Sequence, residues 1–440
     1  MEKLNPWWKG KEAIEEDEDY RKWKESKTKW IPSLLEKIEL KPFSLHFLFG
    51  PRQVGKTTLL KLLVKELLER IENPKAIFYY RCDKLSDYKE LDEILKEYLR
   101  IRKNENIKTS YILLDEVTFP KEWFRAIKFR IDTGDFKNDV LLLTGSLSMF
   151  AKREVETFPG RRGFGRDFVL YPLSFREFIK IFNPNLFEKL EKVEELSISE
   201  IKEKCLKLLP WKEELNEAFE TYLESGGFPL AIKSFLERRE ISEDAKNAYL
   251  SAFIYDLAKL KRSEAIAKRV LKATIEKLPS TVSLNSIAKE FEIKSHKTVF
   301  YYLDLFEKLF VVKNVYFVEP NKAIEVFYKE RKIHLIDPFL YLVFSDWCLV
   351  NLPERSKIVE SVVASHIARK FRIGYWKNGF EIDLVLLDKL IGFEVKWSKK
   401  AEFHKRSVGK IKDIVYLTKE EFNDFPFAIP VSIFLSCLEL

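Results

Sequence analysis

A short segment near the start of the chain has the residue types and spacing of a phosphate-binding loop. Residues 50–57 read Gly-Pro-Arg-Gln-Val-Gly-Lys-Thr and fit G-x-x-x-x-G-K-[ST], between an apolar strand-like run and a helical stretch. The glycines let backbone N–H groups face phosphate oxygens, and the helix N-terminus adds a favourable dipole. Lys56 can reach the β- and γ-phosphates, and the Thr57 hydroxyl can coordinate Mg²⁺. The predicted nucleotide-binding residues are Gly50, Pro51, Arg52, Gln53, Val54, Gly55, Lys56, Thr57 and Thr58.

A second apolar run, Tyr111–Asp115, ends in two adjacent carboxylates. Alone, such a pair is more often a helix cap, but beside a phosphate loop Asp115 is expected to hold Mg²⁺ and Glu116 to polarise the attacking water. A further strand-like run delivers Ser146, whose hydroxyl could sense the γ-phosphate. Thr144 is the alternative sensor, and a serine in this position often only caps a helix. Together these residues predict a protein that binds and hydrolyses ATP, or a similar nucleoside triphosphate, with Mg²⁺.

Phosphoryl transfer of this kind usually also needs an arginine that neutralises charge in the transition state. The Gly/Arg cluster at residues 159–166 is the one well placed to supply it, through Arg161 or Arg162. The alternative is a solvated basic loop. If the arginine came from a neighbouring subunit, the protein would be a homo-oligomer.

Charged residues alternate along two strand-like runs near the carboxyl end. Period two puts Glu381 with Asp383 on one strand face and Glu394 with Lys396 on a face of the next strand. Pairing of these strands would bring Asp383 near Glu394, two hard carboxylates suited to Mg²⁺, with Lys396 able to orient or activate water attacking a phosphodiester. The predicted nuclease site is Glu360, on a preceding helix, with Asp383, Glu394 and Lys396. The alternatives are a half-solvated sheet, or a nuclease-like domain that binds without cleaving.

Between these two regions, two short helical stretches precede two strand-like runs, as in a winged helix. The second stretch opens with Ser295, His296, Lys297 and Thr298, which could meet phosphates or bases if this helix entered a DNA groove. A modest excess of Lys and Arg over Asp and Glu accompanies them. The alternative is a module that only packs against, or couples, its neighbours.

The elements that must position these residues change in character along the chain. Short strands alternate with helical stretches up to about residue 170, which predicts a parallel α/β sheet. A helical region, the two helices with wing strands, and a helix followed by closely spaced strands come next, with a further helix expected over residues 402–412. The expected division is an N-terminal arm (1–40), a phosphate-loop core (41–172), a helical lid (173–275), a winged helix (276–344) and an α/β nuclease-like domain (345–440).

Composition favours a globular, multidomain protein of 440 residues and 52.2 kDa, with 46% hydrophobic and 33% charged residues. The net charge of +8 permits a nucleic-acid partner without requiring one. The four scattered cysteines indicate a reducing compartment, and no apolar run is long enough for a membrane span, so a cytoplasmic protein without a membrane partner is expected. Gln53 is the only glutamine, and abundant Lys and Glu suggest a heat-adapted source.

Several phrases together resemble one family, the archaeal and bacterial predicted AAA+ ATPases that end in a restriction-endonuclease-like domain of unknown function. They are Asn5–Trp8, Gly50–Thr58, Leu113–Glu116, Thr144–Ser146, Gly160-Arg161, Tyr171–Phe178 and Gly226–Pro229. The resemblance implies an AAA+ motor, a helical lid, a winged helix and a nuclease-like end with an α-β-β-β-α-β order and a D…E-x-K site. Two functions stay open: an ATP-dependent DNA-processing enzyme, or an ATP-dependent switch whose nuclease-like domain only binds DNA or protein.

Overall fold

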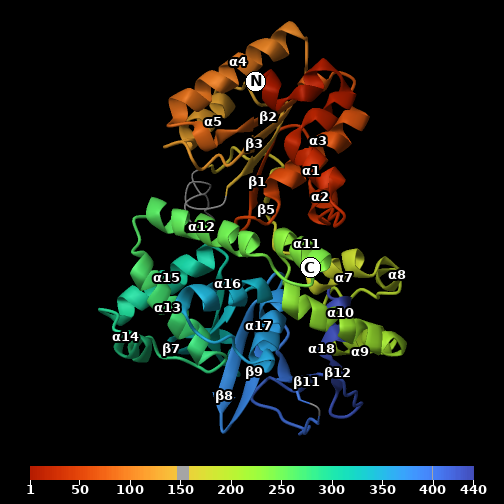
Figure 1. Ribbon diagram of the computed structural model, residues 1–440, viewed down its shortest axis with the longest axis vertical. Helices are drawn as coiled ribbons and strands as arrows, with labels where there is room; N and C mark the ends of the chain where they lie inside the picture. Colours follow the sequence, from red (N-terminus) through yellow and green to blue (C-terminus); the bar gives the residue numbers. More distant parts are fainter. Residues whose placement is uncertain (146–157, 399) are drawn as a thin grey trace. The chain divides into compact units, whose positions relative to one another are not determined.

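The computed structural model describes residues 1–145, 158–398 and 400–440. The chain divides into two compact units, Met1–Tyr171 and Pro172–Leu440, and each is described by itself (Figure 1). The first unit ends at Tyr171, and the finer division into arm, core, lid, winged helix and nuclease-like domain stays a prediction.

The first unit is built on a parallel sheet of five strands in the order β2-β3-β4-β1-β5. Its central strands are almost wholly buried apolar runs, as expected for a parallel sheet covered on both faces. Strand β3 spans the predicted run Tyr111–Asp115, and β4 lies between β3 and β1, which leads into the phosphate loop. The strands are β1 (Ser44–Phe49), β2 (Ile77–Arg81), β3 (Tyr111–Asp115), β4 (Val140–Thr144) and β5 (Asp167–Val169).

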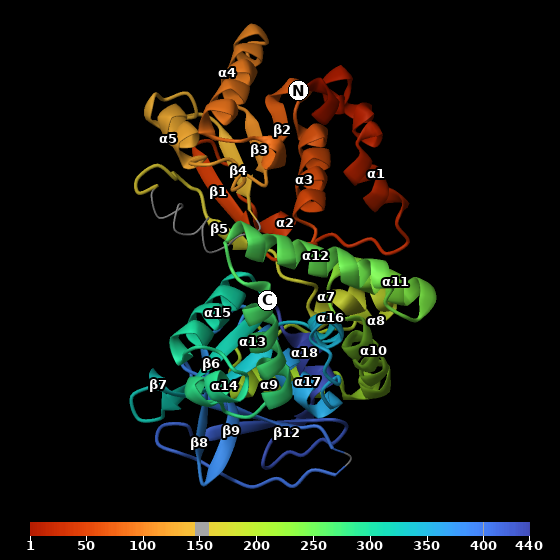
Figure 2. The same cartoon turned by 60° about the vertical axis from the view of Figure 1, so that its left-hand side comes forward.

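Helices of the first unit follow the expected alternation, and α1 lies beside α3 (Figure 2). The first helix after the phosphate loop, α3, is apolar along most of its length and buries nine of its 15 residues. The helices are α1 (Glu18–Glu25), α2 (Leu34–Lys37), α3 (Lys56–Arg70), α4 (Tyr88–Asn104) and α5 (Phe124–Asp132).

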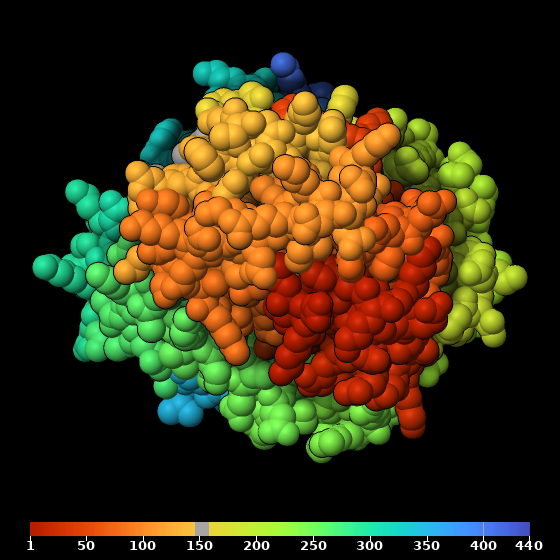
Figure 3. Space-filling model, turned by 90° about the horizontal axis from the view of Figure 1, so that it is seen from above, coloured from red at the N-terminus to blue at the C-terminus, as the bar shows by residue number. Residues whose placement is uncertain are grey.

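The N-terminal arm is an ordered part of the first unit and covers the open edge of its sheet. Strand β2 pairs with β3 on one side only, so its other backbone groups need partners. The Asn5 side chain donates to the carbonyl of Tyr79 (3.0 Å) and accepts from its N–H (2.7 Å), while both indole N–H groups of Trp7 and Trp8 donate to the carbonyl of Ile77. The arm, red in Figure 3, packs beside the orange segment that includes α4, where Trp8 stacks on Tyr98.

The second unit has a mixed sheet of seven strands in the order β12-β11-β10-β9-β8-β6-β7. The hairpin expected as a wing, β6 and β7, joins this sheet because β6 pairs in parallel with β8. No break in the sheet therefore accompanies the expected boundary at residue 345. The strands are β6 (Val312–Glu319), β7 (Ile324–Leu335), β8 (Ile373–Asn378), β9 (Phe380–Leu386), β10 (Ile391–Lys396), β11 (Asp413–Thr418) and β12 (Ala428–Pro430).

Twelve helices are described in residues 172–398 and 400–440. Helix α17 packs against β7 and β10, and α14 against α15. They are α7 (Phe175–Phe182), α8 (Pro184–Phe187), α9 (Ile198–Leu206), α10 (Lys212–Ser225), α11 (Pro229–Arg238), α12 (Glu243–Lys259), α13 (Glu264–Lys277), α14 (Leu284–Glu290), α15 (His296–Lys308), α16 (Pro338–Cys348), α17 (Arg355–Ile367) and α18 (Val431–Cys437).

The prediction of a helix over residues 402–412 is wrong. Residues 401–407 have no regular secondary structure, and a short bridge joins Val408 to Ile411. Contacts within the fold compete with a helix here: the Tyr416 hydroxyl donates to the carbonyl of His404 (2.6 Å), and the Phe403 ring packs edge-on against Tyr416. Strands β10 and β11 are parallel, as the expected element order requires, but an irregular segment connects them.

The Gly226–Pro229 phrase has a packing reason. Asp337, the N-cap of α16, is fully buried and accepts from the backbone N–H of Gly227 (2.9 Å) and of Phe339 (2.9 Å). A side chain on Gly226, whose φ is 67°, would meet Asp337 Oδ1 at 2.4 Å. The glycine pair therefore lets two backbone segments of the second unit come together around one buried carboxylate.

Candidate functional site

The phosphate loop connects the buried end of β1 to the start of α3. Gly50 and Gly55 have φ angles of 151° and 98°, and a side chain at Gly50 would meet the carbonyl oxygen of Leu170 at 2.3 Å. The ammonium group of Lys56 lies inside the loop, where it donates to the carbonyls of Gly50 (3.0 Å) and Pro51 (2.8 Å). The loop therefore holds its lysine at the place where backbone N–H groups and the start of α3 converge.

Asp115 lies at the carboxyl end of β3 and is 1% exposed. Three hydroxyl groups donate to its carboxylate: Thr57 to Oδ2 at 2.7 Å, Tyr79 to Oδ2 at 3.1 Å and Thr144 to Oδ1 at 2.5 Å. The structure thus brings together Thr57 and Asp115, the two predicted metal ligands, from opposite sides of β4. Hydroxyl and carboxylate oxygens are the donors that Mg²⁺ prefers, so this pair fits the ion.

Glu116 follows Asp115 in a left-handed conformation with φ of 53°, which turns the chain away from the strand direction. Its N–H donates to the Thr144 hydroxyl (2.9 Å), which itself donates to Asp115. Thr144, the alternative sensor in the sequence, therefore orients both acidic residues. Ser146 lies outside the described residues.

Lys61, a buried lysine near Asp115, was not predicted from the sequence to belong to the site. The Lys61 ammonium pairs with Asp17 of the N-terminal arm (2.9 Å) and lies 3.2 Å from the centre of the Tyr79 ring, whose hydroxyl bonds Asp115. Burial lowers the pKa of Lys61, against the opposing effect of Asp17. Its signal was a lone lysine within the apolar run 59–64 of α3.

Both candidate arginines pair with aspartates of their own unit. Arg161 Nε lies 2.6 Å from Asp132 Oδ1, and Arg162 Nη2 lies 2.6 Å from Asp167 Oδ1. The Arg162 guanidinium also lies over the Phe47 ring, 5.1 Å from its centre. A role for either residue in hydrolysis stays a prediction.

The predicted nuclease residues fall into two groups. Glu360 and Asp383 form the first group and both pair with Lys332, which was not predicted from the sequence. Lys332, on β7, is 1% exposed, and its ammonium lies 2.8 Å from Glu360, 2.6 Å from Glu381 and 3.0 Å from Asp383. Burial alone would lower the pKa of Lys332, but Asp383, Glu360 and Glu381 raise it, so the group stays charged. Burial, followed by the nearby Asp383, raises the pKa of Glu360 to about 8.

The second group consists of Glu394 and Lys396. Glu394 Oε1 lies 2.5 Å from the Lys396 ammonium and 3.7 Å from Arg406. Asp383 Oδ2 accepts from the N–H of Val395 (2.9 Å), so the two groups are neighbours across β9 and β10, as the sequence predicts. Within the described residues, however, no three His, Cys, Asp or Glu side chains are arranged to hold a metal ion.

The four residues that open α15 divide into a cap and two exposed side chains. Ser295 Oγ accepts from the N–H of Thr298 (3.3 Å), and their hydroxyls lie 3.2 Å apart. His296 and Lys297 are exposed. DNA contact by this helix stays a prediction.

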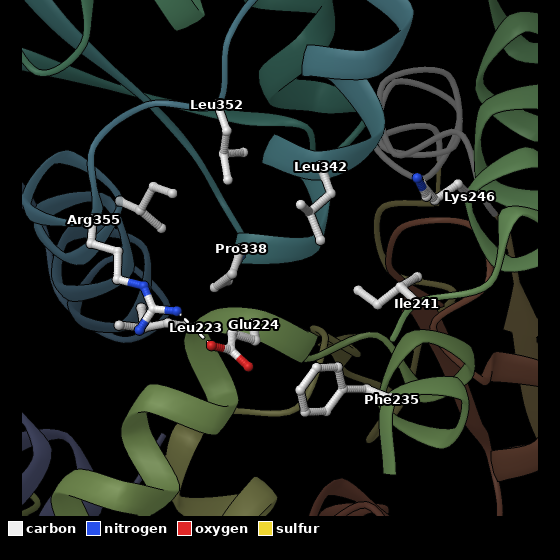
Figure 4. A pocket seen from close by; sticks show the side chains of 10 residues that line it. Leu223, Glu224, Phe235, Ile241, Lys246, Pro338, Leu342, Leu352 and Arg355 are labelled. Carbon is white, nitrogen blue, oxygen red and sulfur yellow. Dashed lines mark hydrogen bonds and ion pairs between the residues drawn. The ribbon is translucent and has the colours of Figure 1, made fainter. Parts of the chain in front are cut away.

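A cavity of about 330 Å³ lies in the second unit, between apolar side chains of α10, α11 and α16 (Figure 4). The charged residues at its edge pair with one another or with neighbours: Arg355 with Glu224 (2.6 Å), and Lys246 with Asp346 (2.7 Å). The cavity therefore offers an apolar interior with neutralised charges at its edge.

Comparisons with known proteins support the assignment of the first unit. Residues 43–179 match the family model of an AAA domain, and residues 216–348 match that of a domain of unknown function, DUF8612. The AAA match and the five-stranded parallel sheet confirm the expected AAA-type phosphate-loop fold. No curated protein matches the chain, and no helix among the described residues is long and apolar enough to cross a membrane.

Solved structures with partial likeness include three proteins. The ORC2 protein of Aeropyrum pernix is 14% identical with a TM-score of 0.38, over 70% of this chain and 88% of that one. RuvB of Thermotoga maritima is 16% identical with a TM-score of 0.28, over 69% and 89%. Cdc6p of Pyrobaculum aerophilum is 14% identical with a TM-score of 0.25, over 70% and 88%. At these scores the overall likeness says nothing of function.

Proposed function

We propose, from the premise that residues 43–179 match an AAA domain, that this chain is a Mg²⁺-dependent ATPase that couples hydrolysis to DNA through its second unit. One observation carries the ATPase proposal. The Thr57 hydroxyl meets the Asp115 carboxylate at 2.7 Å, beside a phosphate loop whose Lys56 points into the loop.

Each residue of the site has a distinct role in this proposal. Lys56 binds the β- and γ-phosphates, and Thr57 with Asp115 would hold Mg²⁺, which neutralises phosphate charge when bound. Glu116 accepts a proton from, or orients, the attacking water. Arg161 or Arg162 would contact the charge that grows in the transition state, either within one chain or from a neighbouring copy in a homo-oligomer.

The test replaces the loop lysine and the proposed base separately. Lys56→Ala should abolish nucleotide binding or turnover, while Glu116→Gln should bind ATP and hydrolyse it about 10²–10⁴-fold more slowly. Lys65→Ala, on the same helix but 42% exposed, serves as the matched control and should resemble wild type. Unchanged turnover in Glu116→Gln would remove Glu116 as the base, and unchanged turnover in Lys56→Ala would end the ATPase proposal.

A second candidate function is the ATP-dependent switch whose nuclease-like carboxyl-terminal domain binds DNA or protein without cleaving. The contacts of Lys332 favour it over a nuclease, because one buried ammonium already contacts oxygens of Glu360, Glu381 and Asp383. A divalent ion held by Glu360 and Asp383 would have to compete with that ammonium for the same oxygens.

Incubation of plasmid DNA with wild-type protein and Mg²⁺ or Mn²⁺ distinguishes the non-cleaving switch from a nuclease. The switch predicts intact supercoiled plasmid, with ATP hydrolysis measured in the same tubes. Nicking that vanishes in Asp383→Ala, with ATP turnover unchanged, would establish the nuclease instead.

A further inference from the structure

Four large aromatic side chains are exposed on two elements of the second unit, helix α15 and the edge strand β7. Phe300 and Tyr301 project from α15, with 41% and 61% of their surface exposed. Phe327 and Tyr328 lie on the edge strand β7, with 62% and 90% exposed. We call these four residues the aromatic surface. Single exposed apolar side chains are normal on a protein surface, whereas several large ones on neighbouring elements usually mark a binding site.

The aromatic surface is held in place by buried contacts. The pairing of β6 with β7 shifts register between Tyr316 and Phe317, so residues 327–330 bulge from the sheet edge. Arg331, itself 5% exposed, lies 4.8 Å from the Tyr316 ring and 5.7 Å from the Phe300 ring. Phe327 packs edge-on against Tyr316 with ring centres 4.7 Å apart. The rings of the helix and of the bulge are therefore joined through Tyr316 and Arg331.

Positively charged side chains accompany these rings on both elements. Within the described part of the chain Lys297 and Lys329 make no ion pair, and the Lys329 ammonium instead lies 3.6 Å from the centre of the Phe317 ring. The nearby carboxylates already have partners. Glu325 pairs with Arg372 (3.3 Å), Asp304 pairs with Lys308 (2.7 Å), and Glu330 accepts from the Thr281 hydroxyl (2.9 Å). A ligand that brings negative charge along with flat apolar groups matches this surface.

We infer that the aromatic surface binds single-stranded nucleic acid, with unpaired bases stacking on its rings and phosphates facing Lys297 and Lys329. Bases in a duplex are stacked on one another and cannot reach such rings, whereas every unpaired base has a face to offer. Reading a duplex would call instead for polar side chains at base edges, and on α15 both Ser295 and Thr298 are engaged in the helix cap. The inference rests on the DNA-binding part of the proposed function and specifies its substrate class.

Fluorescence anisotropy on the full chain tests this inference with a labelled oligothymidylate, an oligouridylate and a mixed-sequence duplex. Wild type should bind the single strands more tightly than the duplex, and the two single strands show whether DNA or RNA is preferred. Phe327→Ala and Tyr328→Ala should each weaken single-strand binding by about fivefold or more. Because both side chains are largely exposed, their loss should leave the fold intact. Phe129→Ala, 55% exposed in the first unit, is the matched control and should bind as wild type does.

Three results would overturn the inference. Duplex binding that depends on Lys297 but not on the rings would keep DNA contact and reject the single-strand preference. Absence of binding to all three probes would reject DNA contact as well. A change in sedimentation coefficient caused by Tyr328→Ala, with nucleic-acid binding unaffected, would show that the rings contact protein.

Discussion

Thr144 shows how one hydroxyl can serve two acidic residues at the end of a parallel sheet. It accepts from the N–H of Glu116 and donates to the carboxylate of Asp115, so the proposed base and the proposed metal ligand share one support. Strand β4 supplies it because β4 lies between β1 and β3. The sequence showed a strand-end threonine but not its partners, since the strand order decides which residues meet there.

Removal of that hydroxyl should affect turnover more than nucleotide affinity. Thr144→Val leaves the Glu116 N–H without its acceptor and frees the Asp115 carboxylate to turn, which should lower kcat on the order of 10–10²-fold. ATP affinity, set mainly by the loop, should change little. Steady-state kinetics and nucleotide titration check this, with Thr144→Ser as the variant that restores the hydroxyl. Equal kcat in the valine variant and wild type would contradict it.

Lys332 is the residue whose loss should cost most in the second unit. Lys332→Met removes the ammonium that contacts Glu360, Glu381 and Asp383, and breaking a buried ion pair costs about 3–5 kcal/mol. Mg²⁺ should restore part of this stability in the variant but not in wild type. Urea unfolding with and without Mg²⁺ measures both effects. Lys322→Met, at an exposed side chain of the same unit, is the control and should be nearly neutral. A Lys332→Met protein as stable as wild type would refute the assignment.

At the scale of elements, apolar runs predicted the parallel sheet well. Strands β3 and β4 begin and end where their runs do, because a strand buried on both faces must be apolar throughout. The prediction of a helix over residues 402–412 was wrong because the local sequence does not show hydrogen bonds from distant side chains to the backbone. The bond from the Tyr416 hydroxyl to the carbonyl of His404 is one of them. Lys61 and Lys332 were missed for a related reason: the carboxylates that pair with them come from distant segments of the chain.

The N-terminal arm should be held to the first unit by the ion pair between Asp17 and Lys61. Asp17→Ala strands a buried ammonium and should destabilise the first unit by about 3–5 kcal/mol, less if Lys61 loses its proton. The double variant Asp17→Ala/Lys61→Met should recover most of that loss, because no charge remains to be buried. Urea unfolding of the single and double variants measures the coupling, and hydrogen exchange of residues 1–25 shows whether the arm detaches. Additive effects would mean that the pair is not coupled.

At the scale of the whole molecule, two buried groups should make the free energy of unfolding change with pH in opposite directions. Burial lowers the pKa of His334 from 6.5 to about 3, so the folded state binds fewer protons than the unfolded state between these values. Its contribution is complete above pH 6.5 and is lost as the pH falls. Burial raises the pKa of Asp337 from 3.8 to about 7, so its ionisation costs stability increasingly as the pH rises through that window.

Single variants measure how the contribution of each group to the free energy of unfolding changes with pH. The free energy of unfolding of wild type minus that of His334→Asn should decrease by up to about 1.4 kcal/mol per pH unit as the pH falls below 6.5. The same difference for Asp337→Asn should decrease as the pH rises from about 4 to 7. Denaturation at several pH values checks both. Parallel curves for wild type and the two variants would contradict the assignment.

The pairing of β6 with β8 also limits where the chain can be cut or exchanged. A fragment that starts at residue 345 would expose the bare edge of β8 and keep Glu360 and Asp383 while discarding Lys332, which pairs with both. Such a fragment should aggregate through its unpaired strand. A fragment that keeps this sheet whole therefore has to start before Val312, so that the hairpin and the carboxylates stay in one polypeptide.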